Sequence, residues 1–259
     1  MKMASPDPYG GYVIATQTGS LPMGGTVADT PIYALRRLPP GMLASASAAA
    51  PAVRRDIDIG GQLAFAIDNV LSETACRTLI DIGEHFGFRN EAPGISTPPG
   101  MRMNQALHWM ADPELLEHIY QAIGPLLPQT LHGRALWPKL SQRINLYKYR
   151  DGDVFNRHTD GDWPGFGFAT DRIGIEEWLG GRSQLTMLLY LNGPQDGVQG
   201  GATRLYGDGG AVVDVTPKAG SALFFQHGFR HGSVVHAGLQ VHGDTPKYVA
   251  RINVLYDSL

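Results

Sequence analysis

The spacing of hydrophobic and polar residues changes near residue 55. Residues 1–55 are rich in Pro, Gly, Ala and Ser and show no sustained periodicity, which predicts an irregular N-terminal arm. The apolar segment 32–35 is the candidate for a short strand in that arm. Residues 56–259 carry regular apolar patterns instead, so we predict that they form the folded domain.

Helical spacing occurs in the first part of this domain. A strand is predicted over 63–71, and Ser72 then suits the N-cap of a helix whose apolar side chains recur at helical spacing as far as Phe86. A second helix is predicted from Asp112, because Asp suits the N-cap and Pro113 the first turn. Both apolar faces indicate that the helices pack against the rest of the domain.

Beyond residue 140 the chain consists of short strand-like runs separated by Gly, Pro, Asp and Asn. Such runs predict a β-sandwich or barrel behind the helices. The runs are 144–149, 184–192, 202–206, 211–216, 221–225, 232–235 and 248–256. The segment 161–182 is longer than a usual hairpin connection and mixes aromatic with charged side chains, which predicts a loop over a functional mouth.

Composition limits the class of protein. The 259 residues are 43% hydrophobic and 17% charged, the formal net charge is −3, and no basic run is longer than a pair. A nucleic-acid groove and an anionic membrane patch are therefore not expected. Cys76 is the only cysteine, the N-terminus lacks a secretory pattern, and no apolar run reaches the roughly 18 residues that span a bilayer. We expect a soluble, cytoplasmic protein and leave its oligomeric state open.

The stretch R-H-T-D-G-D-W over 157–163 carries the first candidate chemistry. In a strand that enters a turn, residues at i and i+2 point to the same face, so His158 and Asp160 can direct an imidazole and a carboxylate to one point. These are two parts of the two-His-one-carboxylate arrangement that holds non-haem Fe(II). Taken alone, the pair is better explained as a hydrogen-bonded turn, because H-x-D occurs by chance in many proteins.

Further motifs occur in a fixed order around this pair. They are R-M-N-Q-A-L-H-W-M-A-D-P (102–113), Y-x-x-G-x-x-F-x-x-H-x-D (149–160), T-M-L-L-Y-L-N (186–192), G-G-A-T (200–203) and V-T-P-K-A-G-S-A-L-F-F (215–225). With them, the chain over about residues 60–259 resembles the 2-oxoglutarate and Fe(II)-dependent dioxygenases of the prolyl 4-hydroxylase-like group. The resemblance implies an α+β fold with a double-stranded β-helix (jelly-roll or cupin-like) core and supporting N-terminal helices.

The resemblance also implies Fe(II), with 2-oxoglutarate (2OG) and O2 as cosubstrates and ascorbate as a candidate reductant. His158 and Asp160 match the first two metal ligands. His236 in H-A-G-L-Q-V fits the family pattern H-x-G-x-P-V best, although Gln240 replaces the proline, and His231 is the alternative third ligand. The remaining histidines are assigned to structural, surface or supporting positions: His85, His108, His118, His132, His227 and His242.

A dioxygenase of this group must also bind the C5 carboxylate of 2OG, which favours a cation in a partly buried site. Lys247 and Arg251 share one face of the last predicted strand, and the resemblance supports either of them in this role. Tyr149 and Thr186 match positions at which the family supplies hydroxyl groups to the cosubstrate.

The implied reaction is hydroxylation, or another oxidation such as desaturation, of an unactivated C–H bond, with 2OG converted to succinate and CO2. Asp160 argues against halogenation, because related halogenases have a small residue at this position. We expect a small-molecule or amino-acid-like substrate, with Asp162, Trp163 and Arg172 as candidate contacts. The alternatives are a hydroxylase acting on a peptidyl residue and a non-catalytic or cupin-like metal-binding β-barrel.

Overall fold

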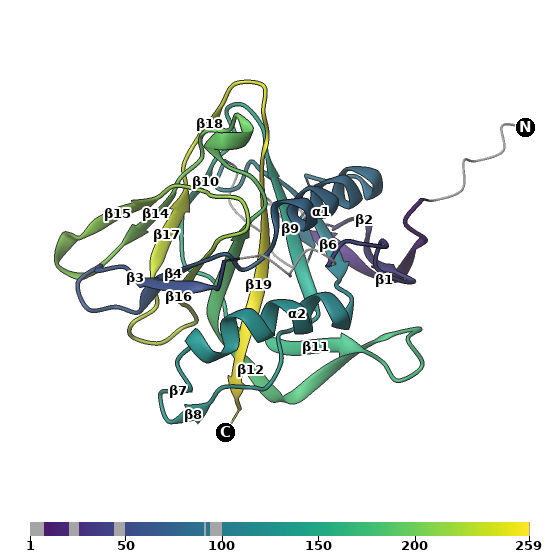
Figure 1. Cartoon of the computed structure of the whole chain (residues 1–259), viewed down its shortest axis with the longest axis horizontal. Helices are drawn as coiled ribbons and strands as arrows, with labels where there is room; N and C mark the ends of the chain where they lie inside the picture. The colour runs from purple at the N-terminus through teal and green to yellow at the C-terminus, as the bar shows by residue number, and fades with distance from the viewer. Residues whose placement is uncertain (1–7, 21–25, 44–49, 91, 94–99, 259) are drawn as a thin grey trace, which may run out of the picture.

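The computed structural model describes residues 8–20, 26–43, 50–90, 92–93 and 100–258. Within these ranges two sheets face each other, and helices α1 (Glu73–Phe86) and α2 (Pro113–Ile123) lie against the large sheet (Figure 1). The strands are β1 (Gly11–Ser20), β2 (Thr26–Leu35), β3 (Val53–Asp56), β4 (Ala64–Asp68), β5 (Ala92–Pro93), β6 (Gln105–Met110), β7 (Thr130–Leu131), β8 (Arg134–Ala135), β9 (Arg143–Tyr149), β10 (Phe155–His158), β11 (Pro164–Phe168), β12 (Ile175–Tyr190), β13 (Gln199–Gly200), β14 (Thr203–Tyr206), β15 (Val212–Val215), β16 (Ala222–Gln226), β17 (Val235–Gly238), β18 (Val241–His242) and β19 (Lys247–Asp257).

The large sheet has the strand order β3-β4-β16-β12-β19-β9-β6-β2-β1-β5, with β11 paired to β12. The smaller sheet has the order β10-β17-β14-β15, and β13-β18 and β7-β8 form short pairs. The arrangement confirms the prediction of a double-stranded β-helix core with supporting helices. The predicted run 232–235 is shifted, because Gly232 adopts a φ of 95° in a turn and β17 begins only at Val235.

Strand β12 shows why the central strands are apolar on both faces. Leu185 and Met187 pack into the core shared with α1 and α2, whereas Leu188 and Tyr190 pack into the core between the two sheets. Successive side chains of a strand point to opposite faces, so a strand covered on both sides reads as a continuous apolar run.

Both helices begin at the predicted residues. The Ser72 side chain accepts a hydrogen bond from the backbone N–H of Ala75 at 3.2 Å, and Asp112 accepts one from that of Glu114 at 2.9 Å. Each cap satisfies a backbone donor that has no partner inside the helix. Neither described helix is long and apolar enough to cross a membrane.

The sequence predicts an irregular arm over residues 1–55, but the part of it that the structure describes contains two long strands, β1 and β2. Strands β1 and β2 pair with each other, and β2 pairs in parallel with β6. Register shifts interrupt the β1–β2 pairing, and Pro31 lies within β2, so no sustained alternation marks these strands in the sequence. Pairing with β6, distant in sequence, supplies the backbone hydrogen bonds.

The segment 161–182 is also different from the predicted loop, because most of it belongs to β11 and the first part of β12, which pair as a hairpin. Gly165 and Gly167 allow this pairing, since a Cβ at Gly167 would lie 2.3 Å from the Trp178 ring. The Trp178 ring therefore packs across the hairpin against Gly165 and Gly167.

Candidate active site

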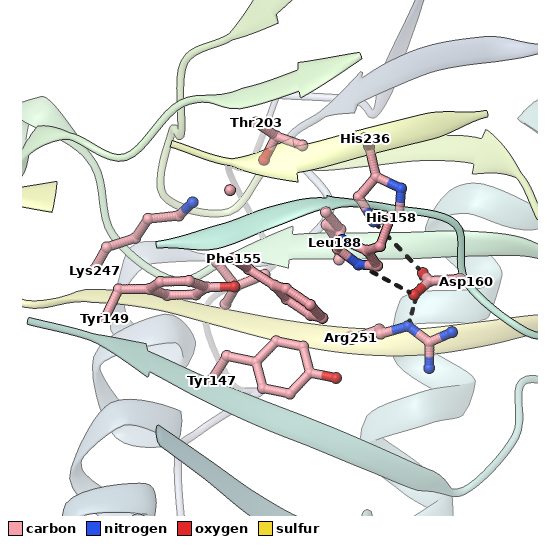
Figure 2. Close-up of a pocket in the computed structure, with 12 residues that line it drawn as sticks. Tyr147, Tyr149, Phe155, His158, Asp160, Leu188, Thr203, His236, Lys247 and Arg251 are labelled. Carbon is pink, nitrogen blue, oxygen red and sulfur yellow. Dashed lines mark hydrogen bonds and ion pairs between the residues drawn. The ribbon is translucent and has the colours of Figure 1, made fainter. Parts of the chain in front are cut away.

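Three side chains that can bind a metal meet between the two sheets. His158 ends β10 and is paired in register with His236 on β17, and Asp160 follows β10. One potential ligand atom from each residue lies within 4.8 Å of the others. The Nε2 atoms of His158 and His236 lie 3.8 and 3.9 Å from the two carboxylate oxygens of Asp160 (Figure 2). Two imidazole nitrogens and one carboxylate form the donor set that suits non-haem Fe(II).

Backbone carbonyls orient both imidazoles toward this point. His158 Nδ1 lies 2.7 Å from the carbonyl oxygen of Asn156, and His236 Nδ1 lies 3.3 Å from that of Val234. Because a carbonyl only accepts, each Nδ1 carries the proton and each Nε2 has a lone pair free. Burial lowers the pKa of His236 to about 4, so its ring is neutral at pH 7 and can act as a ligand.

Asp160 is held as a carboxylate by two donors from the large sheet. Arg251 Nε donates to its Oδ2 at 3.0 Å, and the Thr186 hydroxyl donates to the same oxygen at 2.6 Å. Burial opposes ionisation, but the Arg251 guanidinium and the nearby histidines bring the pKa of Asp160 well below its usual range. The carboxylate is therefore charged and fixed in place before any metal binds.

Thr186 connects Asp160 to a buried chain of hydrogen bonds. Its hydroxyl oxygen lies 2.7 Å from Nδ1 of His227, and His227 Nε2 lies 2.8 Å from the Ser183 hydroxyl. Because the Thr186 hydroxyl donates to Asp160, it accepts from His227. The resemblance placed Thr186 beside the cosubstrate, but in the structure its hydroxyl is engaged by Asp160 and His227, and it orients the carboxylate.

The other end of the same pocket is built around a buried cation. Lys247 is 2% exposed, its Nζ donates to the carbonyl of Gly201 at 2.5 Å, and it lies 4.9 Å from the centre of the Tyr149 ring. Burial lowers the pKa of Lys247 to about 7. Among the described residues no carboxylate lies within ion-pair distance of Lys247. Figure 2 shows the Lys247 side chain at the end of the pocket opposite Asp160. The G-G-A-T motif makes room for it, since a Cβ at Gly201 would lie 2.9 Å from the Lys247 Cδ atom.

Several pocket residues were not predicted as site residues, although most of them lie in or beside the motifs. The described lining includes Tyr147, Phe155, Leu188, Thr203 and Val249 in addition to the predicted residues. Two-residue alternation on β9, which places Tyr147 on the face of Tyr149, is the signal that could have identified Tyr147. Thr203 lies in the G-G-A-T motif, but only the sheet pairing brings it to the pocket.

A larger cavity of about 440 Å³ adjoins the metal cluster. Its described lining is Gln17, Met101, Arg102, His108, Arg143, Asn145, Tyr147, Phe155, His158, Thr159, Asp160, Gly161, Trp163, Phe166, Phe229, Arg251 and Asn253. The cavity is therefore contiguous with the candidate metal site and large enough for a small organic substrate.

Of the three predicted substrate contacts, only Trp163 lines this cavity. Asp162 makes an ion pair with Arg182 at 2.5 Å, and Arg172 lies 3.6 Å from Asp112 and over the Phe168 ring. Asp162 and Arg172 are thus occupied by the hairpin and its neighbours and lie outside the described lining.

Two further histidines of the sequence analysis, His231 and His108, take different places in the structure. His231 is exposed and lies outside the metal cluster, whereas His236 is buried within it. His108 is 6% exposed, and neither of its ring nitrogens has a hydrogen-bond partner in the part of the chain that the structure describes. His108 was expected to be a structural residue, and in the structure it lines the cavity.

Comparison with known proteins agrees with this geometry. Residues 144–255 match the model of the 2OG-Fe(II) oxygenase superfamily. A search of curated proteins finds no match.

Two solved structures resemble the fold. The viral collagen prolyl hydroxylase vCPH from Paramecium Bursaria Chlorella virus-1, solved with 2OG, is 19% identical with a TM-score of 0.51, covering 76% of this chain and 98% of that one. A prolyl hydroxylase from Trichoplax adhaerens, in complex with a hypoxia inducible factor oxygen degradation domain peptide fragment, is 18% identical with a TM-score of 0.51, covering 75% of this chain and 83% of that one. At these identities the likeness shows the fold alone.

Proposed function

We propose that the chain is a 2OG-Fe(II) oxygenase, as the match of residues 144–255 to that superfamily supports, and that it hydroxylates, or otherwise oxidises, an unactivated C–H bond of a small-molecule or amino-acid-like substrate. In this reaction 2OG is decarboxylated to succinate and CO2. The observation that carries the proposal is the cluster of His158, Asp160 and His236 at one end of a pocket whose other end holds Lys247.

His158, Asp160 and His236 are the proposed ligands of Fe(II). Their donor atoms lie close together before a metal is present, so little rearrangement is needed on binding. When bound, Fe(II) supplies the activation of O2 and the oxidative decarboxylation of 2OG. Because Asp160 supplies a carboxylate where related halogenases have a small residue, we propose hydroxylation or desaturation and not halogenation.

Lys247 is the proposed partner of the 2OG C5 carboxylate. A buried ammonium whose hydrogen-bond partner among the described residues is a carbonyl gains a charge-assisted hydrogen bond when a carboxylate enters. Tyr149 and Thr203 line the same end and offer hydroxyl groups. Arg251, the alternative, already donates its Nε to Asp160, which supports a role beside the metal.

A small substrate is supported by the size and position of the cavity beside the metal cluster. The Trichoplax adhaerens enzyme was solved with a peptide, and a peptidyl substrate is the second candidate that the test must separate. The expectation of a cytoplasmic protein remains a prediction from the sequence.

The test of the proposed function is anaerobic addition of Fe(II) and 2OG to the purified protein. We expect a visible metal-to-ligand charge-transfer band that is lost in His158→Ala, Asp160→Ala and His236→Ala. The matched control is His231→Ala, which removes an exposed histidine from the neighbouring turn and should leave the band intact. Absence of the band in folded wild-type protein, checked by circular dichroism, would identify a non-catalytic barrel instead.

A further inference from the structure

The substrate cavity beside the metal cluster is lined by cations that lack acidic partners. Asp160 is the only acidic residue in its described lining, and its carboxylate is committed to the metal cluster and to Arg251. Arg102 and Arg143 line the same cavity, and within the described residues no carboxylate lies within 4.0 Å of either guanidinium. A partly buried cation without an anion is costly, so its presence in a cavity indicates a ligand that supplies the charge.

Neutral contacts hold both guanidinium groups in place. Arg102 Nε donates to the Asn104 side chain at 3.2 Å, while its buried Nη2 has no partner among the described residues. Arg143 Nη2 donates to the Gln17 side-chain oxygen, which comes from β1. Both partners are neutral amide oxygens, so neither of the two positive charges is balanced by a negative one. Each guanidinium also has further N–H groups to donate.

Arg102 is close to the reacting centre. Its guanidinium carbon lies 5.5 Å from the centre of the Phe155 ring, and that ring stacks on His158 with a centroid distance of 3.7 Å. A single aromatic ring thus separates the Arg102 cation from a proposed metal ligand. A substrate anchored by Arg102 would present to the metal a C–H bond within a few bonds of its anionic group.

His108 adds a second unfilled polar position. The cross-strand register places His108 opposite Asn145, which also lines the cavity and whose side chain is the nearby polar group that interacts with the ring. Neither ring nitrogen reaches a described partner at good hydrogen-bond geometry. Burial, together with the positive charges of Arg143 and Arg102, lowers the pKa of His108 to about 3. The neutral ring offers one donor and one acceptor to a polar group of the ligand.

We propose that the substrate of this enzyme is a small carboxylic acid whose carboxylate is bound by Arg102 and Arg143. The planar guanidinium donates two parallel N–H groups that match a carboxylate. The apolar remainder of the cavity, from Met101, Trp163, Phe166 and Phe229, suits a carbon skeleton. This inference rests on the proposed function and narrows its substrate to one chemical class.

The test compares matched substrates on the iron-loaded enzyme. A panel of free and N-acetylated amino acids and simple organic acids, each paired with its methyl ester and primary amide, is assayed for substrate-dependent succinate. Binding is followed in parallel by perturbation of the Fe(II)–2OG charge-transfer band, with inorganic phosphate as a further anion. We expect acids to be accepted and their esters and amides to lose at least 100-fold in kcat/KM.

Variants then test the two arginines. Arg102→Met and Arg143→Met should each raise the KM of an accepted acid at least 10-fold, while the affinity for the cosubstrate and the charge-transfer band stay unchanged. Arg182→Met is the matched control, because Arg182 pairs with Asp162 outside the lining.

Four outcomes would overturn the proposal of a carboxylic acid substrate. If the Fe(II)–2OG charge-transfer band is intact in these experiments, the proposed function is unaffected by them. The four outcomes are preferred turnover of esters or amides, turnover of peptides alone, binding of phosphate in place of acids, and no response to any acid of the panel at millimolar concentration. Loss of the band itself would instead count against the proposed function.

Discussion

Arg251 donates a hydrogen bond from Nε to Oδ2 of Asp160 at 3.0 Å, although the two residues are 91 positions apart in the sequence. Both side chains are largely buried, and Arg251 Nη2 has no partner among the described residues. Asp160 is thus balanced by an arginine in the metal-free protein. A bound metal ion would share this carboxylate with Arg251.

Replacing Arg251 should therefore destabilise the metal-free protein strongly. Arg251→Met leaves Asp160 as a buried, unpaired charge, and we expect the free energy of unfolding at pH 7 to fall by about 3–5 kcal/mol. The depressed pKa of Asp160 contributes stability that is fully present above its unfolded pKa of about 4 and is lost as pH falls below that value, so the difference between the two proteins should shrink below about pH 4. Urea unfolding at several pH values measures it.

The control for this variant is Arg182→Met. Arg182 pairs with Asp162 at 2.5 Å, but its side chain is 44% exposed, so we expect a loss below about 1 kcal/mol. Mn(II) should restore part of the stability of Arg251→Met, because a cation again balances Asp160. Equal losses in the two variants would contradict this account of the pair.

Lys247 should give 2OG binding a pH dependence. Its pKa is about 7 without ligand, and a bound carboxylate favours the charged form, so binding above pH 7 must take up a proton. We expect affinity for 2OG to weaken as pH rises from 7 to 9. Calorimetry in buffers of different ionisation enthalpy measures the proton uptake.

The matched variant is Lys247→Met, which keeps the length of the side chain and removes its charge. It should abolish the pH dependence and weaken 2OG binding at least 100-fold. It should also raise the unfolding free energy of the ligand-free protein by about 1–3 kcal/mol at pH 6, because the cost of burying the ammonium is fully present below pH 7. Tight binding of 2OG in Lys247→Met would instead point to Arg251 as the cosubstrate cation, because its guanidinium stays charged from pH 7 to 9.

Thr186 should act on metal affinity through Asp160. Thr186→Val removes the hydroxyl that donates to Asp160 and accepts from His227, and we expect metal affinity to fall about 10-fold to 100-fold. Mn(II) titration followed by electron paramagnetic resonance measures this. The control is Tyr190→Phe, which also removes a buried hydrogen bond, the one from the Tyr190 hydroxyl to Thr203. This bond does not involve Asp160, so metal affinity should be unchanged. A similar loss in both variants would indicate general loosening.

Glycines of the β11–β12 hairpin should tolerate a methyl group very differently. In Gly167→Ala the new Cβ would meet the Trp178 ring at 2.3 Å, so we expect a loss of about 1–3 kcal/mol in unfolding free energy. In Gly174→Ala the Cβ has an ordinary contact at 3.8 Å, and the change should stay within about 0.5 kcal/mol. Thermal and urea unfolding of both variants and of the wild type measures the difference in unfolding free energy. If Gly167→Ala is as stable as the wild type, the Trp178 ring does not pack against Gly167 as described.

The sequence by itself determined the features that depend on near neighbours. Ser72 and Asp112 mark the helix starts because a cap is a contact within a few residues. The alternation of β12 and β19 follows from strand geometry, and the same geometry directs His158 and Asp160 to one point. Family motifs added the expectation of iron and 2OG, with which the superfamily match agrees.

Only the tertiary structure decided which distant residues meet. The pairing of β10 with β17 places His236, and not His231, opposite His158. Pairing of β2 with β6 brings the N-terminal region, and with it Gln17, to the cavity, although no local periodicity marks these strands. Thr186 and Arg251 meet Asp160 for the same reason. Long-range strand register is set by the packing of the whole core, and no short sequence window contains that information.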